Sequence, residues 1–168
     1  MPAYGYLLDT NILSYLAYPI ESPFRQQVNA KLSQVDPRCL LCISAISWGE
    51  IEYGWKTGMK KSLHDMNRKE LDVFHPLNVS QRTGEAYAEV KARLFEKFGG
   101  DRWQKIRRVE QLRDPMTGAA LGVDENDVWI TAQAIEHKLI LVSHDHMHNI
   151  RAVATQAGLI GFEDWPQP

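Results

Sequence analysis

Cysteine is scarce in this sequence: Cys39 and Cys42 are the only cysteines among 168 residues. They form a lone C-x-x-C pair, and a zinc site would need two further ligands nearby. Cys42 falls in an apolar run typical of a strand, whereas a thioredoxin-type motif precedes or opens a helix. We therefore expect both residues to be buried thiols of a protein in a reducing compartment.

An excess of positive charge is also missing, because the formal net charge at pH 7 is −2. Such a protein does not coat nucleic acid through bulk charge, and any polyanion must meet a local basic patch. No apolar run approaches the length of a membrane span, and the first residues show no signal-peptide pattern. The expected location is the cytoplasm, without a membrane partner.

Short apolar runs and helix-periodic segments alternate along most of the chain. Strands are expected at residues 4–8, 39–43, 139–143 and 159–162, with a further short one within 72–79. Helices are expected at residues 10–18, 21–34, 47–58, 60–71, 80–98, 125–138 and 147–158. This order predicts a single α/β domain over residues 1–168, with a mostly parallel central sheet of about four to five strands flanked by helices on both faces.

Local signals indicate how particular elements begin or end. Pro76 has no N–H for a central strand to use, so its strand should lie at an edge of the sheet. Thr10 or Asn11 is the expected N-cap of the first helix. Ser47 and Glu50 have capping-box spacing, which would begin the helix after the second strand at Ser47 and place Glu50 in its first turn.

Acidic residues stand where the expected strands end. Asp9 follows the first strand, Glu50 lies early in the helix after the second, and Asp145 follows the strand at 139–143. Asp127 opens the helix that precedes that strand. In a parallel sheet these positions share one edge, and crowded carboxylates raise one another's pKa unless cations hold them together. Taken singly, each is better explained as a cap or turn residue, but together they predict a site for Mg²⁺ or Mn²⁺.

Four segments resemble the motifs of PIN-domain ribonucleases, and most closely those of VapC-type toxins from bacterial toxin–antitoxin pairs. The segments are YLLDTNILSYL, ISAISWGEIEYG, ENDVWITAQAIEHKLILVSHD and LIGFEDW, which span residues 6–165. The resemblance implies a PIN-like three-layer α/β/α fold and an endoribonuclease that hydrolyses RNA phosphodiester bonds with Mg²⁺ or Mn²⁺. It also implies a cognate antitoxin protein as a partner, and a homodimer.

The same resemblance assigns roles to residues of the acidic edge. The main metal-binding and catalytic residues would be Asp9, Glu50 and Asp127. Asp145 would be an adjunct in the same catalytic and metal-binding set, acting through water. Asn11 and Ser143 match polar positions of the family and would orient a carboxylate or a water molecule.

The segment at 101–125 is longer than the usual connection before the third acid of the family. It begins with a basic cluster that includes an aromatic residue, made of Arg102, Trp103, Lys105, Arg107 and Arg108, with Arg113 further on. Arginine and an aromatic ring suit phosphate contact and base stacking, so these residues are candidates for RNA binding. A weaker cluster comprises Lys56, Lys60 and Lys61. The alternative for either cluster is a solvated helix face.

His144, His146 and His148 occupy alternate positions. On a strand they would share a face and could bind zinc. The segment lies where a strand becomes a loop and then a helix, so that the common face is lost. We therefore expect no zinc site there.

Other functions fit the sequence less well. A phosphatase of the haloacid dehalogenase type would use Asp9 as its nucleophile, but it needs a second acid where this chain has Asn11. A dinucleotide-binding enzyme would show G-x-G-x-x-G after the first strand, and that motif is missing. A partner-binding PIN-like module without nuclease activity stays open, with the acidic pocket receiving an Arg or Lys from the partner. Thermal stabilisation by Mn²⁺ would distinguish an enzyme from such a module.

Overall fold

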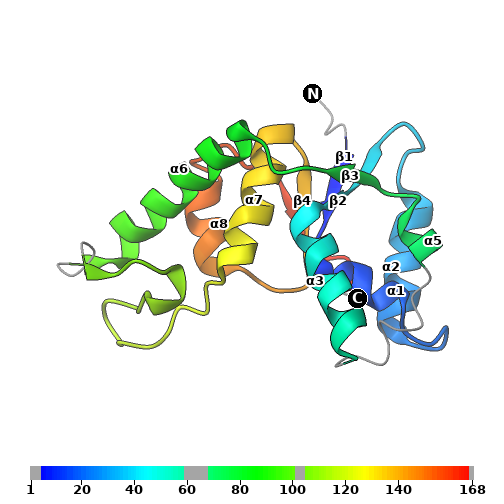
Figure 1. Ribbon diagram of the computed structural model, residues 1–168, viewed down its shortest axis with the longest axis horizontal. Helices are drawn as coiled ribbons and strands as arrows, with labels where there is room; N and C mark the ends of the chain where they lie inside the picture. The colour runs from blue at the N-terminus through cyan, green and yellow to red at the C-terminus, as the bar shows by residue number, and fades with distance from the viewer. Residues whose placement is uncertain (1–4, 59–67, 101–104, 167–168) are drawn as a thin grey trace.

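The computed structural model describes residues 5–58, 68–100 and 105–166 (Figure 1). Its centre is a five-stranded sheet in the order β3-β2-β1-β4-β5. The strands are β1 Gly5–Leu8, β2 Leu40–Ser44, β3 His75–Leu77, β4 Ile140–Val142 and β5 Phe162–Glu163. Every pairing between these strands is parallel. The predicted parallel sheet is therefore confirmed, and β3, which contains Pro76, lies at its edge as expected.

Helices cover both faces of the sheet. One layer contains α1 Thr10–Leu16, α2 Pro23–Gln34, α3 Ala45–Thr57 and the short α5 Arg68–Leu71, and the other contains α6 Gln81–Phe98, α7 Glu125–His137 and α8 His148–Ala154 (Figure 1). This arrangement confirms the predicted three-layer α/β/α fold. Of the helix expected at 60–71, the part before Arg68 lies outside the described residues. No helix in the described ranges is long and apolar enough to cross a membrane.

Side chains that alternate along the strands divide the core into two parts. The layer of α6, α7 and α8 packs against the strand residues Leu7, Cys42 and Leu141. The layer of α1, α2 and α3 packs against their neighbours Leu8, Ile43 and Val142. Because both faces are covered, the central strands are apolar at successive positions, as parallel strands usually are.

The two cysteines differ in their surroundings. Cys42 is buried in the core, and burial raises the pKa of its thiol to about 11. Such a thiol stays protonated and unreactive. Cys39 is only half-buried. The prediction of buried thiols is therefore confirmed for Cys42 and wrong for Cys39, which lies just before β2 begins.

The helix after β2 begins at Ala45, and not at Ser47 as predicted. Ser44 is its N-cap, and its hydroxyl accepts a hydrogen bond of 2.9 Å from the backbone N–H of Ile46. Ser47 is buried within the helix, so the predicted capping box of Ser47 and Glu50 is wrong. Glu50 lies beyond the first turn of α3, where its side chain reaches across to α1.

The first helix is capped by Asp9, and not by Thr10 or Asn11. Oδ1 of Asp9 accepts a hydrogen bond of 2.7 Å from the backbone N–H of Thr10. Thr10 and Asn11 are already helical, and the helix ends at Leu16, ahead of Pro19. Because capping is done by Asp9, the side chains of Thr10 and Asn11 are available for contacts with other parts of the chain.

Further boundaries differ from the prediction, and the last helix, expected at 147–158, runs from His148 to Ala154. The second helix begins at Pro23 rather than at residue 21, since the fixed φ of proline suits the first helical position. The last strand, expected at 159–162, is Phe162–Glu163, which pairs with β4. The long helix expected at 80–98 runs from Gln81 to Phe98, with Ser80 as its N-cap.

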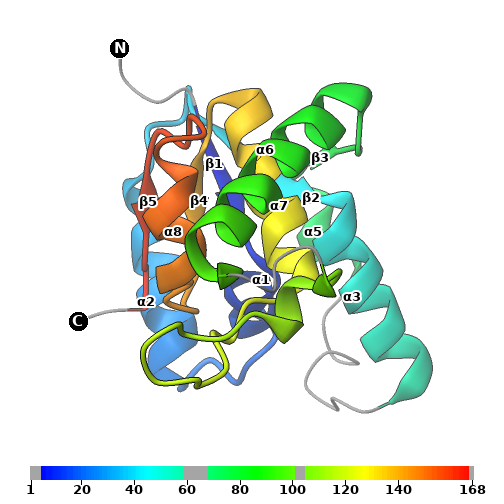
Figure 2. The same ribbon diagram turned by 90° about the vertical axis from the view of Figure 1, so that its left-hand side faces the viewer.

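Residues 105–123, here called the extension, connect α6 to α7. The extension contains the 3₁₀ helix η2 (Val109–Gln111) and a turn closed by an antiparallel bridge between Arg113 and Ala120. Its buried side chains, which pack into the core beside α6 and α7, are Val109, Leu112 and Val123. Both views place the extension at the end of the molecule where α7 begins (Figures 1 and 2).

Glu125 ties the extension to α6 and α7. Its carboxylate accepts hydrogen bonds from the Tyr87 hydroxyl, from the Lys91 ammonium at 2.7 Å and from the backbone N–H of Val109. The Tyr87 ring is itself stacked on Trp129, with 3.9 Å between the ring centroids. Burial alone would raise the pKa of Glu125, but the bonds from Lys91 and Tyr87 outweigh it and hold that pKa below its ordinary value.

We expect Glu125→Ala to loosen the extension. The change leaves the Tyr87 hydroxyl, the Lys91 ammonium and the Val109 N–H without their shared acceptor, which should cost about 1–3 kcal/mol in the free energy of unfolding. Urea denaturation near neutral pH would measure that loss. Trypsin should also cut sooner at the exposed arginines of the extension, which are Arg107, Arg108 and Arg113.

The effect should depend on pH in a definite direction. Because the pKa of Glu125 is lowered on folding, its stabilisation is present above the unfolded value of about 4.3 and is lost as pH falls through the folded value. The difference between wild type and Glu125→Ala should therefore shrink at about pH 3. Glu110→Ala removes an exposed carboxylate of the same extension and is the matched control. Equal behaviour of the two variants would contradict the role given to Glu125.

Candidate active site

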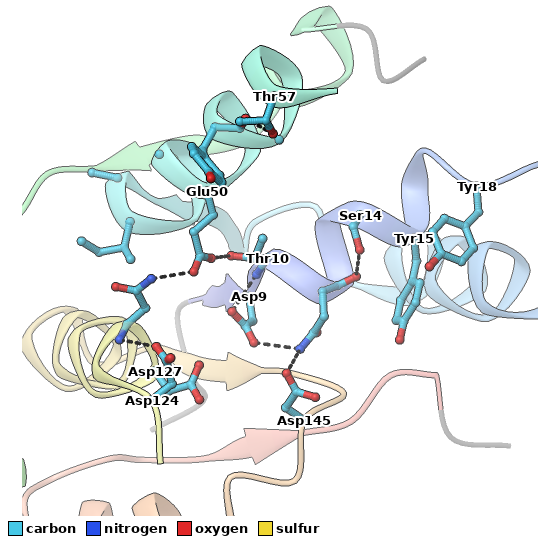
Figure 3. Close-up of a pocket in the computed structure, with 17 residues that line it drawn as sticks. Asp9, Thr10, Ser14, Tyr15, Tyr18, Glu50, Thr57, Asp124, Asp127 and Asp145 are labelled. Atoms are coloured by element: carbon cyan, nitrogen blue, oxygen red, sulfur yellow. Dashed lines mark hydrogen bonds between the residues drawn. The ribbon is translucent and has the colours of Figure 1, made fainter. Parts of the chain in front are cut away.

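A pocket of about 1010 Å³ opens at the carboxyl ends of β1, β2 and β4 (Figure 3). Its lining includes the four acids predicted from the sequence, which are Asp9, Glu50, Asp127 and Asp145, together with Asp124. They come from the start of α1, from α3, from the start of α7 and from the loop after β4. The structure therefore brings together the carboxylates that the sequence placed at one edge of the sheet.

Asp9 lies at the centre of this group and is only 3% exposed. Its backbone N–H donates to the carbonyl of Val142 at 2.9 Å, which extends the pairing of β1 with β4. While Oδ1 caps α1, Oδ2 accepts hydrogen bonds from Asn11 Nδ2 at 2.9 Å and from Ser143 Oγ at 2.7 Å. Both carboxylate oxygens are thus held by uncharged donors, as a buried carboxylate requires.

Asn11 joins Asp9 to the loop after β4. Its Nδ2 lies 3.0 Å from Ser143 Oγ and 3.0 Å from Asp145 Oδ2, while its Oδ1 accepts from the backbone N–H of His144 at 3.1 Å. The backbone N–H of Asp145 donates to Ser143 Oγ at 3.1 Å. The two polar residues singled out in the sequence therefore lie between two of the acids and fix where each carboxylate points.

Glu50 is held by two residues that the sequence analysis did not assign to the site. Thr10 Oγ1 donates to Oε2 of Glu50, and Asn126 Nδ2 donates to Oε1 at 2.7 Å (Figure 3). Thr10 follows Asp9, and Asn126 precedes Asp127, so each sits beside an acid in the chain. Their position beside these acids could have assigned both residues to the site, but Thr10 was interpreted only as a helix cap.

Burial and mutual repulsion make two of these carboxylates, Asp9 and Asp127, hard to ionise. Burial, followed by the negative charges of Asp9, Asp124, Asp145 and Glu50, raises the pKa of Asp127 to about 7. Burial also raises the pKa of Asp9 to about 6, although hydrogen bonds from Ser143 and Thr10 offset part of the effect. The pocket is therefore a place where a bound cation would be strongly favoured.

The donor set fits a hard divalent cation, because every acidic ligand offered is a carboxylate oxygen. In the described residues, however, no group of three or more His, Cys, Asp or Glu side chains is gathered closely enough to hold a metal ion. Glu50 is turned toward Thr10 and Asn126, and Asp145 toward Asn11. A shared cation would require these flexible side chains to rotate toward Asp9.

Those predicted basic residues that the structure describes lie apart from the pocket lining. Lys105, Arg107 and Arg108 are exposed on the extension, and Arg107 borders a second hollow between the extension and α6. Arg102, Trp103, Lys60 and Lys61 fall outside the described residues, and Lys56 is exposed near the end of α3.

The alternating histidines do not act as a unit. His146 and His148 are exposed and stacked on each other, with ring centroids 5.1 Å apart. His144 lies instead against Tyr15, and its Nδ1 is 2.9 Å from Asp164 Oδ1. His144 therefore links the loop after β4 to the segment after β5.

A parallel sheet between two helical layers, with carboxylates gathered where its strands end, is the framework of an α/β protein with an acidic candidate active site. The sequence profile of the PIN domain matches residues 6–155, and the chain belongs to this family. No curated protein matches the chain significantly.

Solved structures with a similar fold include three bacterial complexes. VapBC2 from Rickettsia felis, bound to a DNA fragment from its promoter, is 18% identical, with a TM-score of 0.63 over 95% of this chain and 98% of that one. VapBC-1 from nontypeable Haemophilus influenzae is 21% identical, with a TM-score of 0.62 over 96% and 98%. FitAcB from Neisseria gonorrhoeae is 19% identical, with a TM-score of 0.61 over 96% and 97%. At these identities the likeness concerns the fold.

We expect Asp127→Asn to stabilise the protein in EDTA at about pH 8. Because folding raises the pKa of Asp127, its contribution to stability is full below the unfolded value of about 3.9 and is lost as pH rises through about 7. Asparagine keeps the shape and removes the repulsion, which should outweigh the lost helix-dipole contribution. The melting temperature should rise by roughly 5 °C.

The same comparison at about pH 4 should show little difference, because Asp127 is then protonated in the folded protein. Asp72→Asn changes an exposed carboxylate outside the pocket lining and is the control. A melting temperature of Asp127→Asn at or below that of wild type at the higher pH would show that repulsion in the pocket is not a net cost to folding.

Proposed function

We propose that this protein is a Mg²⁺- or Mn²⁺-dependent endoribonuclease that hydrolyses RNA phosphodiester bonds. The observation that carries the proposal is the convergence of Asp9, Glu50, Asp127 and Asp145 in one open pocket, where burial and repulsion raise the pKa of two of them. Membership of the PIN family, whose proteins are generally nucleases, supports it.

The residues divide the work according to their positions. Asp9, Glu50 and Asp127 would hold the cation, with Asp145 contributing through water. A bound Mg²⁺ or Mn²⁺ would lower the pKa of an attacking water and offset the negative charge that builds up on the phosphate. Asn11 keeps Asp9 and Asp145 aimed at the same space, and Ser143 fixes Oδ2 of Asp9.

The hydrogen bonds of Asp9 argue against the phosphatase alternative. A nucleophilic aspartate needs a carboxylate oxygen exposed to the substrate. Asp9 is 3% exposed, Oδ1 caps α1, and Oδ2 accepts bonds from Asn11 and Ser143. These bonds suit a buried metal-binding carboxylate better than a nucleophile.

We also propose that the protein is the toxin of a toxin–antitoxin pair and acts as a homodimer that a cognate antitoxin holds inactive. The names of similar structures support the toxin–antitoxin part of this proposal. Two of the three structures described above are VapBC proteins, and another similar structure, from Klebsiella pneumoniae, is a toxin–antitoxin complex. The partner-binding module without activity is the weaker alternative, because all four acids are intact.

The test is cleavage of a mixed pool of structured RNAs with Mg²⁺, with Mn²⁺ and with EDTA. We expect wild type to cut in either metal and not in EDTA. Asp9→Asn and Asp127→Asn should each slow cutting by on the order of 100-fold or more, because each removes a carboxylate that would hold the cation. Both should also lose the thermal stabilisation that Mn²⁺ gives wild type. Asp72→Asn should behave as wild type, and folded Asp9→Asn and Asp127→Asn proteins that cut normally would refute the proposal.

The extension should supply affinity for the RNA backbone. Reversing the charge of both exposed arginines, in Arg107→Glu/Arg108→Glu, should weaken RNA binding by about 10-fold. The slope of log Kd against log salt should fall by about one for each phosphate that the variant no longer binds. Fluorescence anisotropy with the Asp127→Asn protein at several KCl concentrations would measure both quantities.

Lys31→Glu/Arg38→Glu provides a matched charge reversal. Both residues are exposed and lie near the amino end of β2, away from the pocket at its carboxyl end. An unchanged affinity and salt slope in the arginine variant, or an equal reduction in the control, would show that the extension is only a solvated surface.

A further inference from the structure

The pocket is much larger than the group of acids within it. A water molecule takes up about 30 Å³ in the liquid, so a hydrated cation fills only part of the volume of about 1010 Å³. The remainder lies between α1 and α3, and the residues that line it there are Ser14, Tyr15, Tyr18, Tyr53, Gly54 and Thr57. In Figure 3, Tyr15 and Tyr18 lie on the opposite side of Asp9 from Asp124 and Asp127.

On the α3 side, Tyr53 is the prominent residue. Glu50, Tyr53 and Thr57 are spaced by three and four positions, so they share the helix face that meets the pocket. Tyr53 is 60% exposed, although its ring is large and mostly apolar. The Thr57 hydroxyl is used within the helix, donating to the backbone carbonyl of Tyr53 at 2.9 Å. The Tyr53 ring is thus the part of this face presented to a ligand.

On the α1 side, the tyrosine rings are held in place by their neighbours. Tyr15 is stacked on Phe24 with 4.8 Å between centroids and meets Tyr18 edge-on at 5.3 Å. The backbone carbonyl of Tyr18 accepts a hydrogen bond of 2.6 Å from Arg25 Nη1. The α1 end of the pocket is therefore lined by aromatic rings that their neighbours hold in place.

The charges of the pocket restrict what can lie between these walls. Among the described residues of the lining, every charged side chain is a carboxylate. A phosphate group would be repelled there except where a cation neutralises the acids. A nucleobase is flat and uncharged, and aromatic rings bind it by stacking whatever its sequence. The base is therefore the part of a nucleotide that this space suits.

The distance along α3 also fits one nucleotide. Tyr53 lies three residues beyond Glu50, which is about 4.5 Å along the helix axis. A base against Tyr53 therefore adjoins a phosphate placed at the acids.

We propose that Tyr53 is a nucleobase-binding residue, stacking on the base next to the scissile phosphate while Tyr15 and Tyr18 form the facing wall of the subsite. The inference rests on the proposed ribonuclease function. A base inserted in this way cannot be paired, so the nucleotide beside the cut must be single-stranded. Tyr53 does not touch the reacting atoms and acts by binding.

The test uses three proteins: wild type, Tyr53→Phe and Tyr53→Leu. Phenylalanine keeps the ring, while leucine keeps apolar bulk and helix propensity without the ring, so that the variants differ in stacking. Because Tyr53 is largely exposed, both variants should retain the wild-type melting temperature. The probe is a short oligouridylate carrying one fluorescent adenine analogue, whose emission is quenched when it stacks on an aromatic ring.

Binding is measured with Ca²⁺ in place of the catalytic metal. Wild type and Tyr53→Phe should bind the unpaired probe equally and quench it, while Tyr53→Leu should bind it about 10-fold more weakly and lose the quenching. Annealing the probe to its complement should abolish the difference between the three proteins. With an RNA that wild type cleaves, Tyr53→Leu should raise KM by a similar factor and leave kcat nearly unchanged, because stacking is equal in the ground and transition states.

The outcomes separate this inference from the function on which it rests. If wild type cleaves RNA but Tyr53→Leu binds, quenches and cleaves as wild type does, the subsite is wrong and the ribonuclease stands. A fall in kcat at unchanged KM would also overturn a binding role. If wild type neither binds nor cleaves RNA in any metal, the proposed function fails and the inference with it. Binding of an arginine-containing peptide that depends on Tyr53, without any RNA binding, would assign the groove to a protein ligand instead.

Discussion

Repulsion among carboxylates at the carboxyl edge of the sheet is the constraint that the surrounding structure has to offset. Asp9, Glu50, Asp127 and Asp145 line one pocket, and the pKa values of Asp9 and Asp127 are raised by burial first and then by this repulsion. The neighbours that hold them are uncharged: Thr10, Asn11, Asn126 and Ser143 each donate to a carboxylate oxygen. Uncharged donors keep the carboxylates in place without neutralising them. The negative potential is thereby preserved for a cation.

Core packing and strand pairing position these carboxylates. Leu7 and Leu8 anchor β1 in the two halves of the core, and the backbone N–H of Asp9 pairs with Val142 of the neighbouring strand. By contrast, Glu125 lies two residues before Asp127 in α7. Its carboxylate is paired with Lys91 and Tyr87 and turned toward the extension. Two acids of the first turn of α7 therefore have different roles: burial and neighbouring carboxylates raise the pKa of Asp127, while the pKa of Glu125 is lowered.

The sheet, the parallel direction of its strands and the meeting of the four acids could be predicted from the sequence. The alternation of strands with helices and the positions where strands end both follow from local pattern. Helix caps were predicted less well. Ser44 and Asp9 took the capping positions because each is the last residue of a strand or directly after one, and a residue there has the extended backbone that a cap needs. Contacts between distant segments, such as Thr10 with Glu50 or Asn126 with Glu50, could not be predicted because they depend on how α3 and α7 sit across the pocket.

The separation of charge in this chain bears on how the proposed substrate would be held. Acidic side chains line the pocket, while Lys105, Arg107 and Arg108 are exposed on the extension, which reaches the pocket wall near Asp127 through Leu121 and Val123. An acidic pocket alone would repel RNA, and a basic surface alone would bind RNA without selecting the phosphodiester bond to be cut. Because the basic side chains lie on the extension and the tyrosines line the pocket, affinity for the RNA backbone and placement of a base would be separate properties. Under this proposal, an RNA would be selected by whether an unpaired base reaches Tyr53 while phosphates further along the strand lie on the extension, which is a demand on the shape of the RNA more than on its sequence.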